Sequence, residues 1–163
     1  MKLFRSIAKS FCAVFLGGRV LGKQTRKFNA LQQEGLRLAD AAERLVLAFP
    51  AEVGISSGNA LTEVQKFRLN FMVDVPLRNY KERKSPAGKQ AILNLAVGNL
   101  KGISRDAAVV KLRITSMSSD VPHIKKIRAQ FEVFIRSIRN LKLEFEKLKK
   151  KPMPQPQLIG STQ

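Results

Sequence analysis

The chain is poor in the residues that build disulfide frameworks, metal sites and base-stacking surfaces. It has one cysteine, one histidine, one tyrosine and no tryptophan in 163 residues. Cys12, standing alone, excludes an internal disulfide framework and a thiolate metal site, and it fits a reducing intracellular compartment. A single histidine, His123, cannot build a metal site, and no serine or cysteine near it in sequence is placed to act as a nucleophile. We therefore expect no cofactor, no metal and no enzymatic activity.

Acidic residues and long apolar runs are also scarce. No stretch of about 18 uncharged apolar residues occurs, so no membrane-spanning helix is predicted. Lysine and arginine together number 30 against 12 acids, which gives a formal net charge of +18. Self-repulsion at this charge opposes compaction, so a polyanionic partner is expected. Nucleic acid is the commonest such partner, and an anionic membrane surface is the next.

The small aromatic content bears on how nucleic acid would be bound. With no tryptophan and only Tyr80 among the tyrosines, stacking on bases would have to come from phenylalanine or arginine. Most of the phenylalanines lie in apolar seams that are expected to form the core. The sequence therefore favours contacts with the phosphate backbone, with low sequence specificity, over reading of bases.

The strongest structural pattern is a long helix predicted over Asp120 to Lys151. Its apolar residues are spaced alternately three and four apart, which is the a/d pattern of a coiled coil. We call them the C-terminal seam: Ile124, Ile127, Phe131, Phe134, Ile138, Leu141, Phe145 and Leu148. Asp120 and Pro122 suit a helix start, and Pro152 ends the helix. At ~1.5 Å per residue the helix is about 48 Å long and needs a partner helix.

A second helix with the same spacing is predicted over residues 24–49, and Pro50 ends it. Its apolar positions, the N-terminal seam, are Phe28, Leu31, Gly35, Leu38, Ala42, Leu45 and Phe49. Two matching seams in one chain predict that the two helices pack along each other, with a crossing angle of about +20°. We expect an antiparallel pair within one chain, and pairing between two copies is the alternative.

Residues 60–75 fit both a helical and a strand period. We predict a helix, because Asn59 can cap it and the segment is long. The predicted apolar face consists of Leu61, Val64, Phe67, Phe71, Met72 and Val75.

The segment 85–117 also allows two structures. Ser85 and Pro86 form a cap and first-turn pair for a helix that Gly102 would end, and Ser104 could start another helix. A β-hairpin of 91–97 with 108–115 is the alternative, because Val109, Val110 and Ile114 are β-branched. The predicted fold class is thus mainly α, with two long packed helices and a shorter helical middle section, and α+β is the alternative.

Residues 1–22 are predicted to form a basic amphipathic arm, which is followed by a helical domain (23–151) and a flexible tail rich in proline and glutamine (152–163). The first 33 residues contain no acid. The arm could be a mitochondrial presequence, a helix in the interface of an anionic membrane, or an arm that packs on protein. The residues expected at such a membrane or partner contact are Leu3, Phe4, Ile7, Phe11 and Phe15.

Glycines at 17, 18 and 22 predict a flexible hinge after the arm. Together with Lys23 they also match the spacing of a phosphate-binding P-loop. The motif fails at its last position, where Gln24 stands in place of the serine or threonine that would hold magnesium. We therefore rank nucleotide hydrolysis below the other hypotheses.

Basic residues around the C-terminal seam and in the 81–84 loop are the candidate nucleic-acid contacts. These are Lys81, Arg83, Lys84, Lys125, Lys126, Arg128, Arg136, Arg139, Lys142, Lys147 and Lys149. The sequence predicts a basic structural subunit of a nucleoprotein assembly, such as a ribosome-like particle, a virion or a packaging complex. The alternative is a peripheral membrane or coiled-coil adaptor that uses the N-terminal arm. A reducing compartment, a virion or the mitochondrial matrix would suit these predictions.

Overall fold

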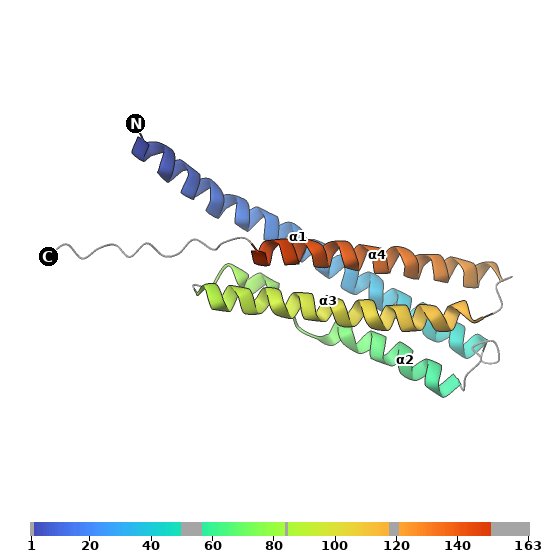
Figure 1. Ribbon diagram of the computed structural model, residues 1–163. Helices are drawn as coiled ribbons and strands as arrows, with labels where there is room; N and C mark the ends of the chain where they lie inside the picture. Colours follow the sequence, from blue (N-terminus) through green and yellow to red (C-terminus); the bar gives the residue numbers. More distant parts are fainter. Residues whose placement is uncertain (1, 50–56, 84, 118–120, 151–163) are drawn as a thin grey trace.

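In a computed structural model, the chain forms four α-helices arranged as an up-and-down bundle (Figure 1). They are α1 (Lys2–Ala48), α2 (Ser57–Leu69), α3 (Pro86–Thr115) and α4 (Pro122–Lys150), with short 3-10 helices η1 (Asn70–Met72) and η2 (Leu77–Tyr80) between α2 and α3. The structure describes the backbone of residues 2–49, 57–83, 85–117 and 121–150, and side chains from Leu21 onward. This part of the chain contains no strand, so the mainly α prediction is confirmed and the β-hairpin alternative is wrong.

The four helices form a closed ring of neighbours. Helix α1 packs against α2 and α4, and α3 packs against α2 and α4. Successive helices run in opposite directions along the bundle (Figure 1). The bundle can therefore be divided into two layers, an α1–α2 layer and an α3–α4 layer, which press the core between them.

The C-terminal seam is the inner face of α4, as its spacing predicts. Seven of its members are buried, and Leu148 at the end is partly buried. Ile135, which lies beside the seam, is buried as well. The predicted cap Asp120 and the predicted last residue Lys151 lie outside the described residues.

The N-terminal seam is the inner face of α1, and the predicted antiparallel pair with α4 is confirmed. Phe28, near the start of this part of α1, contacts Phe145, near the end of α4, edge to face with ring centroids 6.4 Å apart. Leu38, Ala42 and Leu45 are buried further along. The two long seams therefore belong to one core within the chain, which α2, η1 and α3 complete.

The ambiguous segment after Asn59 is helical, and two details of its prediction are wrong. Helix α2 begins at Ser57, so Asn59 lies inside the helix and is not its cap. After Leu69 the chain continues as the 3-10 helix η1. Phe71 is buried as predicted, but Met72 is 72% exposed and does not belong to the apolar face.

Helix α3 starts as predicted but does not end at Gly102. The Ser85 side chain caps it by accepting a hydrogen bond from the backbone N–H of Gly88 at 3.1 Å. The helix then continues through Gly102 to Thr115. The glycine at this position allows the side chain of Asn70 to approach the helix backbone closely. A Cβ there would lie 2.7 Å from the side-chain oxygen of Asn70, which packs against this turn. The prediction of two helices, one on each side of Gly102, is therefore wrong, because a single helix spans both segments.

Glycines also fail to break α1. The helix is continuous from Lys2 through Gly17, Gly18 and Gly22 to Ala48, contrary to the predicted hinge. A glycine costs a helix about 1 kcal/mol relative to alanine, which a long helix can tolerate. The P-loop interpretation is wrong for the same reason, because that motif needs a loop whose backbone amides surround the phosphates.

Candidate nucleic-acid interface

Positive charge is distributed unequally between the two layers of the bundle. Helices α3 and α4 carry fourteen lysines and arginines against four acids, a net charge of +10. Helix α2 and the part of α1 from Leu21 carry seven against four, a net charge of +3. The excess in the α1–α2 layer comes from the first turns of that part of α1, where Lys23, Arg26 and Lys27 lie. Among the residues whose side chains the structure describes, the α3–α4 layer therefore carries the larger net positive charge.

The acids of α4 do little to neutralise the basic residues of the same helix. Glu132 pairs with Lys111 of α3 at 2.8 Å, and Glu144 pairs with Lys27 of α1 at 2.5 Å. Only Glu146 pairs within α4, with Lys142 at 3.5 Å. Among the described residues, no ion pair engages the remaining basic residues of α4, which are Lys125, Lys126, Arg128, Arg136, Arg139, Lys147, Lys149 and Lys150.

Glu132 lies within a cluster of basic residues from two helices. Besides its ion pair with Lys111, it has Arg128 one turn before it and Arg136 one turn after it on α4. The hydrogen bond from Lys111 is the main cause that lowers the pKa of Glu132, and the charges of Arg128 and Arg136 add to it. This part of the α3–α4 layer is therefore a strongly positive environment with one carboxylate in it.

Glu144 joins α1 to α4 near the end of the bundle. Its carboxylate accepts hydrogen bonds from Lys27 and from Gln24, the latter at 2.6 Å. The Lys27 hydrogen bond is the main cause that lowers the pKa of Glu144, and it outweighs the opposing effect of burial. Gln24 stands where a P-loop would have the serine or threonine that binds magnesium. In this structure it is buried and forms a hydrogen bond with α4.

The predicted basic loop lies at the end of the bundle where α4 finishes. Lys81 and Arg83 follow η2 and are exposed, while Lys84 lies outside the described residues. Helix α3 begins beside the last turn of α4 (Figure 1). The loop therefore lies at the same end of the bundle as the last turn of α4.

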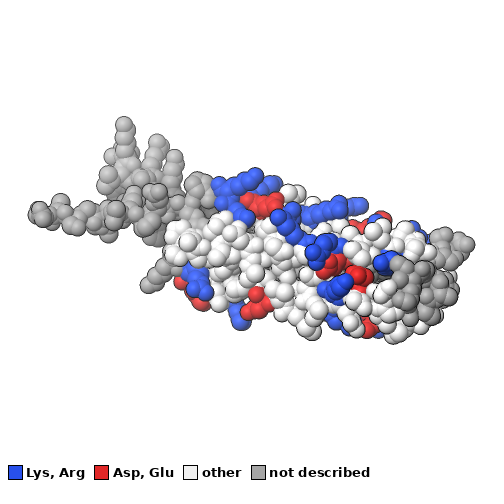
Figure 2. Space-filling view, turned by 60° about the horizontal axis from the view of Figure 1, so that its bottom comes forward, with Lys and Arg blue, Asp and Glu red and all other residues white. Residues whose placement is uncertain are grey.

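The predicted contacts on α4 differ in exposure. Most of them are exposed, but Arg128, Lys142 and Lys149 are partly buried. On the face drawn in Figure 2, basic side chains are interspersed with acidic ones and form no unbroken patch. The side chains of Leu3, Phe4, Ile7, Phe11 and Phe15 lie outside the described part of the chain.

Sequence reasoning missed the contribution of α3. Lys111 reaches across to α4, and Lys101 is exposed on the same helix ten residues earlier. Ten residues fall about 80° short of three helical turns at about 3.6 residues per turn, so the two lysines point in different directions around α3. Because a helix end is predicted at Gly102, they are assigned to different helices and neither is named as a candidate.

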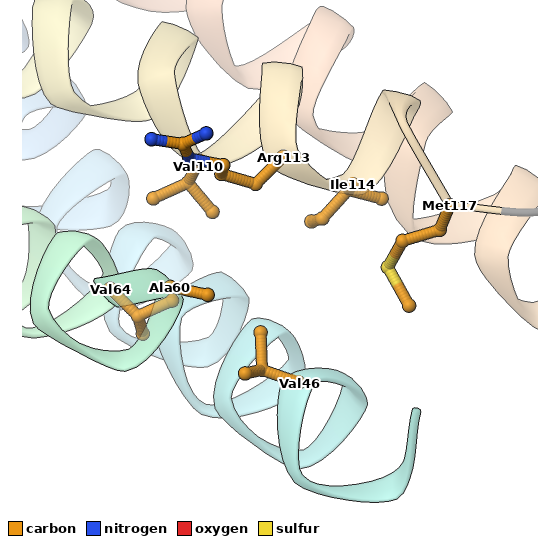
Figure 3. A pocket seen from close by; sticks show the side chains of 7 residues that line it. All are labelled: Val46, Ala60, Val64, Val110, Arg113, Ile114 and Met117. Atoms are coloured by element: carbon orange, nitrogen blue, oxygen red, sulfur yellow. The ribbon is translucent and has the colours of Figure 1, made fainter. Parts of the chain in front are cut away.

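The remaining candidate sites are weaker. A small apolar pocket at the other end of the bundle has only one polar lining side chain, that of Arg113, whose guanidinium lies beside Val110 at its edge (Figure 3). The other lining residues are Val46, Ala60, Val64, Ile114 and Met117. The described residues contain no group of three histidine, cysteine or acidic side chains that could hold a metal. Among them, no helix is both long and apolar enough to cross a membrane.

Comparison of the chain with protein-family models, with curated proteins and with solved structures finds no match in any of the three.

Proposed function

We propose that this protein is a non-enzymatic basic structural subunit that binds the phosphate backbone of nucleic acid within a larger nucleoprotein assembly. The observation that carries the proposal is the unequal charge of the two layers. A net charge of +10 lies on α3 and α4, and most basic residues of α4 have no acidic partner among the described residues. Lysine and arginine arranged in this way neutralise phosphates and release their counterions.

The dimensions of α4 suit a groove or a strand of nucleic acid. Its 29 residues give a length of about 43 Å at ~1.5 Å per residue. That length corresponds to about 13 nucleotides at ~3.4 Å per nucleotide along one strand of a duplex. The exposed basic residues occur from the first turns of the helix to its last turn, so contacts can follow the backbone over its whole length.

Low sequence specificity is supported by where the aromatic residues lie. Of the described phenylalanines, only Phe49 is more than slightly exposed, and it is partly buried. Tyr80 is partly buried, and burial raises the pKa of its hydroxyl. Among the described aromatic rings, only those of Phe49 and Tyr80 are partly exposed, so little aromatic surface is open to a base and binding through phosphates is favoured.

A role within an assembly is supported by the length of α1. This helix of 47 residues begins well outside the bundle, and its first turns extend beyond the ends of its neighbours (Figure 1). A helix that long has room for contacts beyond its own bundle. Other protein subunits or a second stretch of nucleic acid are the proposed partners of that part.

The proposal is tested by titrating the protein with duplex and with single-stranded DNA at several salt concentrations. The logarithm of the binding constant should fall linearly with the logarithm of the salt concentration, by about 0.9 for each phosphate neutralised in a duplex. Unrelated sequences should bind with similar affinity. A response that does not depend on salt, or no binding at low salt, would contradict the proposal.

A peripheral membrane role is the second candidate. It is favoured by the continuity of α1, which keeps the amphipathic spacing of residues 2–15 in helical register. Deleting residues 1–16 separates the two functions. Binding to anionic vesicles should be lost if the arm is the membrane contact, while nucleic-acid binding should largely remain.

A further inference from the structure

Lys111 is the only described basic residue of α3 that forms an ion pair with α4. Its ammonium group lies 2.8 Å from a carboxylate oxygen of Glu132, and 30% of its side chain is exposed. Arg128 and Arg136 lie on α4 one turn to either side of that carboxylate. Glu132 itself is 56% exposed, so solvent and a ligand can reach the group.

We infer that the nucleic-acid backbone crosses the bundle at Lys111, Arg128 and Arg136, and that Glu132 limits the affinity of this site. The inference rests on the proposed function and specifies where on the bundle the nucleic acid binds. Lys111 pairs with Glu132, and the charges of Arg128 and Arg136 act on the same carboxylate from positions one turn away. Cations of this kind also bind phosphate. The carboxylate thus holds the place that a phosphate would take, and binding requires Lys111 to exchange one anion for the other.

Glu132 differs from the other acids of α4 in ways that make it the limiting one. Glu144 is bonded to both Gln24 and Lys27 and joins α1 to α4, so it has a structural role. Glu146 pairs at 3.5 Å with Lys142, a residue of its own helix. Among the acids of α4, only Glu132 pairs with a basic residue of α3, and the arginines one turn to either side of it form no ion pair within the described part of the chain.

The test measures the affinity of the full chain for a 20-base-pair duplex DNA with Glu132→Gln and with a control, Asp40→Asn. Asp40 is matched closely: it is 57% exposed and pairs across helices with Arg68 at 2.6 Å, but it lies in the α1–α2 layer. Both changes remove one negative charge. Circular dichroism and thermal unfolding establish that both variants keep the fold.

Glu132→Gln should tighten binding by about threefold to tenfold near 0.1 M salt, and the salt dependence should steepen by about one phosphate equivalent. Asp40→Asn should change the affinity by much less. A second pair tests the cation: Lys111→Ala should weaken binding by a similar factor, while Lys66→Ala on α2 should not.

Equal effects of Glu132→Gln and Asp40→Asn would overturn the inference, since the gain would then reflect net charge alone. Equal effects of Lys111→Ala and Lys66→Ala would overturn it as well. In both cases salt-dependent binding by the unmodified protein would leave the proposed function standing. Absence of binding by the unmodified protein would instead remove the proposed function itself.

Discussion

Gly35 of α1 lies against the Phe71 ring of η1, and replacing it with alanine should destabilise the protein. A Cβ at this position would lie 2.1 Å, 2.3 Å and 2.9 Å from three atoms of the Phe71 ring. Contacts this short cannot persist, so either the ring or the helix must shift. The ring has little freedom, because it packs against Phe67 at 5.0 Å and against Phe134 at 6.3 Å between centroids.

The magnitude follows from two opposing effects. Forcing an extra carbon into a packed core costs about 1–3 kcal/mol. Alanine regains about 1 kcal/mol over glycine because it favours the helix. We therefore expect Gly35→Ala to lower the free energy of unfolding by up to about 2 kcal/mol, since the packing cost exceeds the helix gain.

The chain offers a matched control on α3. Gly98 is exposed in the interior of the helix, and a Cβ there would meet no atom within 4 Å. Gly98→Ala should raise the free energy of unfolding by up to about 1 kcal/mol. Urea denaturation followed by circular dichroism measures both variants. A stabilising effect of Gly35→Ala, equal to that of Gly98→Ala, would refute the packing of Phe71 on α1.

Further predictions concern the core and the buried carboxylate. Phe131 is fully buried beside Phe67 in α2, so Phe131→Ala should lower the free energy of unfolding by about 3–5 kcal/mol. Val133 is 61% exposed, so Val133→Ala should lower it by less than about 0.5 kcal/mol. Chemical denaturation measures both variants, and equal effects would contradict the orientation of α4. Burial opposes ionisation of Asp106, but hydrogen bonds from Arg105 and Asn70 outweigh it and lower its pKa. Because the folded pKa lies below the unfolded value, the stabilisation is present above about pH 4 and is lost as the pH falls through the folded pKa. The free energy of unfolding should therefore fall more steeply from about pH 5 to pH 2 in the unmodified protein than in Asp106→Asn, and parallel curves would contradict this.

The predictions that the structure confirms depend on long, regular apolar spacing. The N-terminal seam and the C-terminal seam were each seven or eight positions long, so one misplaced residue could not hide the helical period. The antiparallel pairing of these helices was also predictable, because each seam needed a partner and the connecting chain was long enough. Phe28 and Phe145 contact each other as that argument requires.

The predictions that failed depend on contacts between distant segments. Gly102 looked like a helix end, yet it is a glycine because Asn70 of η1 packs on it. Asn70 itself donates a hydrogen bond to Asp106 at 2.8 Å, and Asn99 donates one to the backbone oxygen of Asn70 at 2.8 Å. These contacts between η1 and α3 depend on single polar residues, which leave no periodic pattern in the sequence.

Only part of the candidate interface is predictable from the sequence, because the rest also depends on contacts between distant segments. Exposed basic residues on α4 could be named from the sequence, since they lie outside the C-terminal seam. The gathering of charge on one layer could not, because it depends on which helix becomes the neighbour of α4. Lys111 became a candidate only when α3 was seen to lie beside α4.

We propose that the α3–α4 layer is the surface that binds nucleic acid. The most direct measurement compares the salt dependence of duplex DNA binding for two double variants of equal charge. One removes Arg136 and Arg139 from α4 (Arg136→Ala with Arg139→Ala), and the other removes Arg37 and Lys66 from the α1–α2 layer (Arg37→Ala with Lys66→Ala). The first should reduce the salt slope by about two phosphate equivalents, and the second should leave it nearly unchanged. Equal slopes for the two variants would contradict the account.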